Sequence, residues 1–422
     1  MARKMKDSGI EWIGEIPKEW TINSISQLFS QVKNKNTDLQ ETNLLSLSYG
    51  KIKRKNIETT DGLLPESFDG YNIVESNDIV LRLTDLQNDH KSLRVGLVTE
   101  RGIITSAYLT IRNHSESIAK YLYFYLHAFD ISKGFYGMGA GVRQGLNWDG
   151  IKWLKILSPS IPEQQAIADF LDTQCTHIDS VIEKTRAAIE EYKRLKQSVI
   201  TQAVTKGIRP NREMKDSGIE WIGEIPKEWA VQRIKTIFNL RDERNYLPLE
   251  EVNLISLYTD KGVVQHSDLE KTTGNKASNA DGYKKVYEND IIVNIILCWM
   301  GAIGRSSYQG VTSPAYDIYV PSNTIECRFY HHYFRTKGFS GDCYKRGKGI
   351  MAMRWRTYSD QFRDIKVVVP PLKEQQEILN YLDEKTAAID SLISKKEQLI
   401  SELEAYKKSL IYEYVTGKKE VE

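Results

Sequence analysis

Two stretches of the chain carry hydrophobic residues at a mixed spacing of three, four and seven positions, with polar residues between them. They run over 163–206 and 373–416, and neither contains a glycine or a proline. A heptad-like stripe sustained over about 40 residues predicts a long coiled-coil helix. The predicted helix-pair core consists of Ile167, Leu171, Ile178, Ile182, Ile189, Tyr192 and Val199 in the first helix, and of Ile378, Leu382, Ile389, Leu392, Leu399, Leu403, Tyr406 and Leu410 in the second.

Each stripe needs an apolar partner, because a long exposed hydrophobic stripe favours association. Antiparallel pairing of the two helices would bury both stripes and place two domains at opposite ends, related by a pseudo-twofold axis. The alternative is that each amphipathic helix only covers its own domain. We predict the antiparallel pair, because it removes both stripes from water.

The residues outside the two helices have a different pattern. Short β-type runs, such as 78–83 and 290–297, alternate with Gly, Asn and Asp turn residues. Helical patterns are few, and 117–129 and 328–336 are the candidates. The sequence therefore predicts an α+β fold for these parts.

The chain is an internal repeat. The string MKDSGIEWIGEIPKEW occupies Met5–Trp20 and again, letter for letter, Met214–Trp229. IPEQQAIADFLD at Ile161 recurs as PLKEQQEILNYLD at Pro371. One half of about 210 residues has thus been duplicated. We predict a first domain over 1–160, a central helix over 161–207, a second domain over 208–370 and a distal helix over 371–422.

The charge is balanced over the chain and concentrated locally. The formal net charge is only +2, but residues 328–366 hold 10 basic and 3 acidic residues. A basic face on a balanced protein is an electrostatic footprint for nucleic acid. The four cysteines lack metal-ligand spacing, and no apolar run is long enough for a membrane span, so we expect a reduced cytoplasmic protein.

Catalytic signatures are missing from the sequence. The closest approach to a phosphate-binding loop, GDCYKRGKG at Gly341, has the wrong spacing. No Asn-Pro dipeptide occurs, so an adenine methyltransferase tetrapeptide is excluded. Glu191 and Lys193 have a nuclease-like spacing but lie on the heptad helix, and His331 and His332 lie in an aromatic run typical of a core. We predict no catalytic residue and no metal site.

These features together resemble the specificity subunit of type I restriction–modification systems. The resemblance rests on the opening string, the E-Q-Q helix starts, the duplication and the C-terminal V-T-G, and it covers essentially the whole chain. It implies two target-recognition domains that each read one half of a bipartite double-stranded DNA sequence. It also implies that the long helices act as spacer and as docking surface for two modification subunits, which methylate adenine.

The resemblance further implies that restriction subunits, with the motor and the nuclease, complete the enzyme. S-adenosylmethionine, ATP and Mg²⁺ would then be bound by partner subunits and not by this chain. Two alternatives remain open at this point: a self-sufficient DNA methyltransferase or nuclease, and a coiled-coil adaptor that binds only protein.

DNA-reading residues are expected where the two halves diverge and where hydrogen-bond donors gather. Arg suits guanine and Gln suits adenine, while Lys mostly contacts phosphate. Ordinary solvated surface charge is the alternative for about half of such residues. The candidates are Tyr49, Lys51, Lys53, Arg54, Lys55, Arg82, Arg94, Arg143 and Gln144 in the first domain, and Lys261, Arg305, Tyr308, Gln309, Lys345, Arg346, Lys348, Arg354 and Arg356 in the second.

Overall fold

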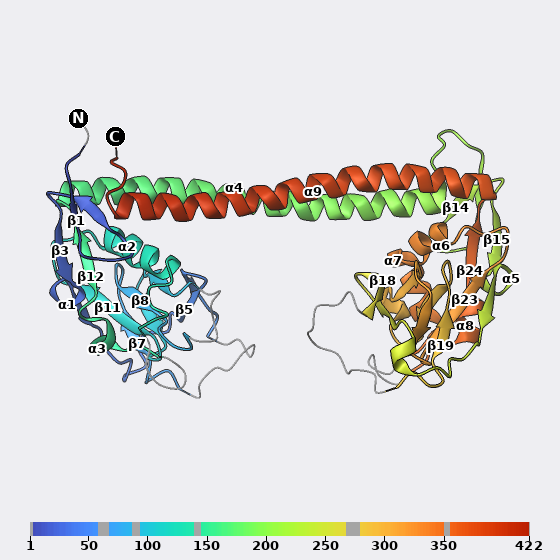
Figure 1. Ribbon diagram of the computed structural model, residues 1–422, viewed down its shortest axis with the longest axis horizontal. Helices are drawn as coiled ribbons and strands as arrows, with labels where there is room; N and C mark the ends of the chain where they lie inside the picture. Colours follow the sequence, from blue (N-terminus) through green and yellow to red (C-terminus); the bar gives the residue numbers. More distant parts are fainter. Residues whose placement is uncertain are drawn as a thin grey trace. The chain divides into compact units, whose positions relative to one another are not determined.

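The computed structural model describes residues 3–57, 67–86, 93–138, 145–266, 279–349 and 355–421. The chain forms two compact units (Figure 1). Unit 1 comprises 1–186 and 398–422, and unit 2 comprises 187–397. Each unit therefore combines one α+β domain with a part of each long helix.

Unit 1 is built around a four-stranded antiparallel sheet with the strand order β4-β11-β8-β9. Two-stranded ladders surround it and join β1 to β2, β3 to β12, β5 to β6 and β7 to β10. Helix α2 packs against β9, and its aromatic side chains fill the core. The elements are β1 (Met5–Asp7), β2 (Glu15–Pro17), β3 (Thr21–Ser24), α1 (Ile25–Leu28), β4 (Phe29–Gln31), β5 (Leu45–Ser48), β6 (Lys51–Arg54), β7 (Asn72–Val74), β8 (Ile79–Leu81), β9 (Val95–Leu97), β10 (Gly102–Ile104), β11 (Leu109–Asn113), α2 (Ala119–Ile131), α3 (Trp148–Ile151) and β12 (Lys155–Ser158).

Unit 2 repeats this topology. Its main sheet has the order β16-β23-β20-β21, and its ladders join β13 to β14, β15 to β24, β17 to β18 and β19 to β22. The elements are β13 (Met214–Asp216), β14 (Glu224–Pro226), β15 (Ala230–Arg233), α5 (Ile234–Ile237), β16 (Phe238–Arg241), η1 (Leu249–Glu251), β17 (Ile255–Tyr258), β18 (Gly262–Gln265), β19 (Lys284–Val286), β20 (Ile291–Asn294), η3 (Cys298–Met300), β21 (Ile303–Arg305), β22 (Gly310–Thr312), β23 (Tyr316–Pro321), α6 (Cys327–Phe334), α7 (Lys337–Arg346), α8 (Ser359–Arg363) and β24 (Lys366–Val369).

The long helices α4 (Ile161–Lys206) and α9 (Leu372–Val415) run antiparallel and pack together, as predicted (Figure 1). In unit 1, Lys407 pairs with Asp179 at 2.6 Å, and Arg186 pairs with Glu404 at 3.1 Å. In unit 2, Lys196 pairs with Asp390 at 2.6 Å. The internal offset of 211 relates Lys196 to Lys407 and Asp179 to Asp390, so this ion pair is itself duplicated.

Most of the predicted stripe faces inward, but part of the α9 register was wrong. Leu392, Leu399 and Tyr406 are 41%, 40% and 54% exposed. The inward positions lie one residue later, at 393, 400 and 407. From Leu382 onward the inward positions then alternate in steps of four and three residues, as a heptad repeat requires. The slip arose because 392 and 393, like 399 and 400, are both apolar. The other predicted residues are buried (Ile167, Leu171, Ile178, Ile182, Ile189, Ile378, Leu382, Ile389 and Leu410) or partly buried (Tyr192, Val199 and Leu403).

The repeated string builds the joint between each domain and the long helices. Trp20 and Trp229 are fully buried. The Trp20 indole N–H donates to Glu163 at 3.0 Å, and Arg3 also pairs with that carboxylate at 2.7 Å. In unit 2, Arg212 pairs with the equivalent Glu374. Trp20 thus holds the glutamate of its E-Q-Q motif by a hydrogen bond, whereas Trp229 packs beside the equivalent Glu374.

The central glutamine of each E-Q-Q motif ties the long helix to its domain. The Gln164 side chain accepts from the Ile118 backbone N–H at 2.9 Å and donates to the Pro159 carbonyl at 2.9 Å. Gln375 makes the same bonds to Glu326 and Pro370, at 2.9 and 2.8 Å. Both glutamines are buried, so these bonds satisfy backbone groups at the start of α2 and of α6.

Candidate nucleic-acid interface

The β5–β6 hairpin presents the first group of candidate residues. Its two-residue turn is Tyr49-Gly50, and both residues have positive φ, of 48° and 76°. Turns of this kind match the twist of the strands they connect. A Cβ atom at Gly50 would lie 3.0 Å from the Leu93 Cβ, so the turn packs closely on the domain. Tyr49 is 73% exposed at the tip, where no packing requires an aromatic ring.

The basic side chains of β6 differ in how they are held. Lys51 pairs with Asp179 of α4 at 2.8 Å. The Arg54 Nε donates to Glu100 at 2.7 Å, and this carboxylate raises the pKa of Arg54. Lys53 and Lys55 are exposed. Lysine charges that stay in water on a hairpin strand suit phosphate contacts, which need no fixed geometry.

A groove of about 660 Å³ lies between this hairpin, α2 and the helix pair of unit 1. Five cationic and three carboxylate side chains line it, so the groove carries an excess of positive charge. Its cations are Lys51, Lys53, Arg186, Lys407 and Lys408, and its carboxylates are Asp179, Glu183 and Glu404.

His127 lies at the floor of this groove, beneath the hairpin turn. It is 6% exposed, and its Nδ1 has no hydrogen-bond partner among the described residues. Burial, assisted by the charge of Lys407, lowers the pKa of His127 to about 4. The imidazole is therefore neutral at pH 7, and the positive charge of the groove comes from lysine and arginine.

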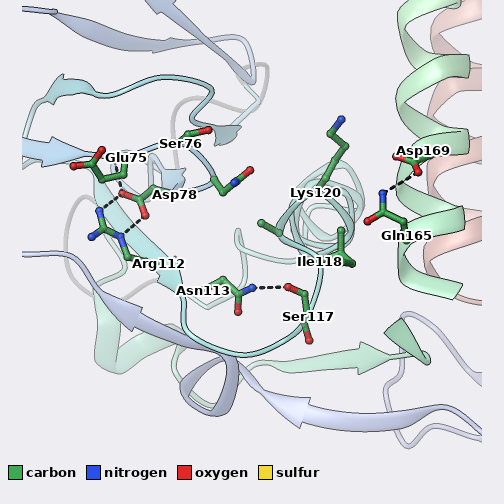
Figure 2. Close-up of a pocket in the computed structure, with 12 residues that line it drawn as sticks. Glu75, Ser76, Asp78, Arg112, Asn113, Ser117, Ile118, Lys120, Gln165 and Asp169 are labelled. Atoms are coloured by element: carbon green, nitrogen blue, oxygen red, sulfur yellow. Dashed lines mark hydrogen bonds and ion pairs between the residues drawn. The ribbon is translucent and has the colours of Figure 1, made fainter. Parts of the chain in front are cut away.

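A second, smaller pocket of unit 1 has the opposite character. It has a volume of about 640 Å³ and lies between the β7–β8 turn, α2 and the start of α4. Figure 2 shows Asp78 facing Arg112, with two contacts of 2.7 Å. On the far side, Gln165 donates to Asp169 at 2.8 Å (Figure 2). Acidic side chains outnumber basic ones here, so we exclude this pocket from the candidate interface.

In unit 2, the β17–β18 hairpin replaces β5–β6 and is held differently. The Arg335 guanidinium donates to the carbonyls of Thr259 and Asp260, both at 2.9 Å, and to that of Ile303 at 3.1 Å. Burial lowers the pKa of this arginine. Arg335 thereby fixes the turn that carries the exposed Lys261. Sequence reasoning missed Arg335, because nothing local in the sequence indicates distant carbonyl partners.

The end of α7 gathers the basic residues of unit 2. The backbone of Lys348 bonds to that of Arg356, at 2.8 and 3.0 Å. Lys345 and Arg346 end the helix just before, and Lys345 pairs with Glu220. Part of the basic stretch noted in the sequence, Lys345, Arg346, Lys348 and Arg356, thus lies close together, whereas Arg328 pairs with Asp383 of α9 and Arg335 with backbone carbonyls.

Aromatic side chains adjoin these basic residues, and sequence reasoning did not single out two of them, Trp299 and Tyr344. Trp355 stacks on Tyr344 with ring centroids 4.9 Å apart, and Tyr344 also contacts Trp299 at 5.6 Å. Tyr344 is 49% exposed and Met300 is 53% exposed. Tyr344 and Trp355 alternate with the basic residues of the stretch, and this was the available sequence signal.

Several predicted DNA-contacting residues lie elsewhere than expected. Arg94 is fully buried, and its guanidinium donates to the carbonyls of Arg82 and Thr84, at 3.0 and 2.8 Å. Its prediction as a base reader was therefore wrong, and it supports the loop after β8. Arg305 is partly buried and donates to Asn289 at 2.8 Å, and Tyr308 packs on the core. Gln309 is exposed, and Arg82 and Arg356 are partly buried. Arg143, Gln144 and Arg354 lie outside the described residues.

The helices in the described part of the chain do not combine the length and the hydropathy that a membrane span requires. Both units carry candidate basic residues on a repeated frame: in unit 1 they lie on the β5–β6 hairpin, and in unit 2 mainly at the end of α7. Fold and site together define a duplicated α+β protein with two different basic faces and a shared pair of long helices.

Comparison with known proteins identifies the family. The family model for the type I restriction modification DNA specificity domain matches residues 17–191 and 226–405. The chain therefore belongs to the family of type I restriction–modification specificity subunits. A relative from Methanocaldococcus jannaschii, named provisionally as the type I restriction enzyme MjaX specificity subunit, is 23% identical over 96% of this chain and 95% of its own length. The EcoDI specificity subunit of Escherichia coli is 22% identical over 63% of this chain and 62% of its own length.

Solved structures share the fold. A chain from a study of complex assembly and conformational transition of the type I restriction–modification system has a TM-score of 0.68 at 12% identity, covering 96% of this chain and 99% of its own length. The HsdS subunit from Thermoanaerobacter tengcongensis has a TM-score of 0.51 at 14% identity, covering 96% of this chain and 98% of its own length. At these identities the likeness supports the predicted architecture but does not identify the residues that contact DNA bases.

Proposed function

We propose that this chain reads a bipartite double-stranded DNA target, with each α+β domain contacting one half-site. The supporting observation is that the two units share one topology and carry different residues at the tips of equivalent hairpins. Equivalent hairpin tips have Tyr49-Gly50-Lys51 in unit 1 and Thr259-Asp260-Lys261 in unit 2. Two half-sites of different sequence need different base contacts, whereas the frame that holds the readers can be the same.

The contacts divide between phosphate binding and base reading. Lys53, Lys55, Lys261 and Lys348 are exposed cations on or beside the hairpins and loops of the two domains, and they contribute mainly phosphate contacts. Arg346 and Tyr344 contact base edges, and the support for this is their exposure at the end of α7 beside the aromatic cluster. Base-reading residues also include Arg143, Gln144 and Arg354, as the sequence predicts.

The chain acts as a scaffold without catalysis of its own. Two modification subunits methylate adenine with S-adenosylmethionine, and restriction subunits supply ATP- and Mg²⁺-dependent cleavage. Support comes from family membership and from the lack of methyltransferase, nucleotide-binding and nuclease motifs in the sequence. The purified chain alone should therefore show no methylation, ATP hydrolysis or cleavage. Turnover in a preparation free of partner subunits would overturn this part.

The test is methylome sequencing of the host with and without the gene for this chain. We expect one bipartite motif, methylated on adenine in both half-sites, that disappears on deletion and returns on complementation. Purified chain plus modification subunit should methylate the same motif in vitro. An unchanged methylome on deletion, together with no complex in vitro, would contradict the proposal.

A further inference from the structure

The turn that follows β20 in unit 2 presents apolar side chains to water. Leu297 and Met300 are 37% and 53% exposed there, and the Met300 N–H donates to the Leu297 carbonyl at 2.9 Å. Side chains three positions apart lie on the same side of a 3₁₀ turn, so these two form one patch. A single exposed apolar residue is ordinary on a protein surface, whereas a patch of them indicates a binding surface.

The same turn is held in place by side-chain bonds to its backbone. The Asn294 side-chain oxygen accepts from the N–H groups of Ile296 and Leu297, at 3.0 and 3.3 Å. The Arg335 guanidinium donates to the Gly301 carbonyl at 3.3 Å. A turn that is fixed in this way presents its side chains at a defined position, which a specific contact requires.

Basic residues lie beside the patch. Trp299, which lies between the two apolar residues in the chain, contacts Tyr344 of α7 with ring centroids 5.6 Å apart, and the exposed Arg346 ends that helix. Arg335, which bonds to this turn, also bonds to the Asp260 carbonyl in the turn that carries the exposed Lys261. Because such cations attract phosphate groups, the occupant that fits the patch is DNA.

The equivalent turn of unit 1 has a different character. The tripeptide DGY at Asp69 recurs 212 residues later, at Asp281. The same offset places Asp85 of unit 1 at the position of Leu297 in unit 2. The turn is therefore acidic at this position in one unit and apolar in the other. A difference of this kind is expected where two domains read half-sites of different sequence.

We propose that Leu297 and Met300 contact the C5-methyl group of a thymine in the half-site that unit 2 reads. The inference rests on the proposed function and specifies the base chemistry of one half-site. Among the groups that base pairs present in the major groove, the thymine methyl is the apolar one, and apolar side chains contact it. The lysine and arginine charges beside the patch bind the flanking phosphates.

Deoxyuridine tests this contact, because it lacks only the methyl group of thymidine. Each thymine of the methylated motif is replaced in turn, and the affinity of the assembled methyltransferase for each duplex is measured. At one position or more, all in one half-site, the replacement should weaken binding by the unsubstituted complex about fourfold, which corresponds to one buried methyl group. A complex with Leu297→Ala and Met300→Ala should bind the thymine and uracil duplexes equally.

Two control variants separate this contact from general surface effects. Met300→Leu keeps an apolar side chain and should keep the discrimination between thymine and uracil. Leu240→Ala truncates a leucine that is 39% exposed on β16, which lies at the other edge of the main sheet from β21, and it should also keep the discrimination. Melting temperatures are compared in the same preparations. If Leu297→Ala lowers the melting temperature, Met300→Gln alone replaces the double variant, because Met300 is more than half exposed.

Three results would count against this contact. The double variant could discriminate between thymine and uracil as well as the unsubstituted complex does, or no thymine of the motif could show the effect. Equal loss of affinity for every duplex would assign the turn to phosphate contacts or to folding, and so would also overturn the inference. Failure of the unsubstituted complex to prefer its motif over unrelated DNA would instead contradict the proposed function.

Discussion

Arg94 in unit 1 and Arg335 in unit 2 are both largely withdrawn from water and both donate to backbone carbonyls. Arg94 holds the carbonyls that follow β8, whereas Arg335 holds the β17–β18 turn and the end of η3. They come from different elements, β8–β9 and α6–α7, and support different loops. By contrast, Gln164 and Gln375 make the same bonds in both units. The two copies are therefore alike where the domains join the helices. They differ in the contacts that support the loops carrying their candidate DNA-contacting residues.

The largest expected effect is on stability, at the joint where Trp20 and Trp229 connect each domain to the long helices. Trp20→Ala and Trp229→Ala should each cost about 3–5 kcal/mol of unfolding free energy, because each removes a fully buried indole. Phenylalanine separates the copies: Trp20 donates to Glu163, whereas the Trp229 indole N–H has no partner among the described residues. Trp20→Phe should therefore cost more than Trp229→Phe, by about 1 kcal/mol. Urea titrations decide it, and equal costs would show that the two joints are not distinguished by this bond.

The loop-supporting arginines offer the next effect. Arg335→Met leaves several carbonyls without a donor and should cost about 1–3 kcal/mol, as should Arg94→Met. The two variants should differ in what they do to DNA recognition. Arg335→Met should reduce base specificity in only one half of the methylated motif, and Arg94→Met only in the other half. Methylome profiles in which either variant degrades both halves equally would break the assignment of one domain to one half-site.

Acid should weaken unit 2 more than unit 1. Burial lowers the pKa of His331 to about 3 and of His332 to about 4, whereas among the described residues of unit 1 it lowers only that of His127, to about 4. Unfolded histidine binds a proton below about pH 6.5, while the folded groups stay neutral, so stability falls as pH falls from about 6.5 towards 4. Each group contributes up to about 1.4 kcal/mol per pH unit. His332→Gln should flatten the pH dependence of the urea midpoint, and an unchanged slope would refute this source.

The smallest effect concerns phosphate contacts. Lys53→Ala with Lys55→Ala should weaken DNA binding by the assembled methyltransferase at every sequence alike. Each lost contact should lower the slope of log affinity against log salt by roughly 0.9. Lys261→Ala with Lys348→Ala should do the same from unit 2. A change in motif, rather than in slope, would reassign these lysines to base reading.

The sequence predicted the elements that depend on periodicity. The helices over 161–206 and 372–415, and α2 and α6, were all predicted with small errors at their ends. Helix α7 was not predicted, since Gly338 and Gly341 interrupt its pattern. The α9 register slipped by one residue, because neighbouring apolar residues made two registers equally good.

The candidate site was less predictable, because exposure and long-range partners decide it. Arg94 looked like a base reader because its charge is visible in the sequence, while its carbonyl partners are set by tertiary packing. Lys53, Lys55 and Lys348 are exposed as expected of surface cations. Their contact with DNA stays a prediction.

The central claim is that each domain reads its own half-site on a shared frame, and a domain duplication tests it most directly. Thr21 pairs with Ser158 at the base of unit 1, and Ala230 pairs with Val369 at the base of unit 2, so 21–158 can be replaced by a second copy of 230–369 between paired strands. Methylome sequencing of cells with this chain and the modification subunit should show a motif made of two copies of the half-site that unit 2 reads, without the other half-site. An assembled, active complex that still methylates the original two-part motif would contradict the account.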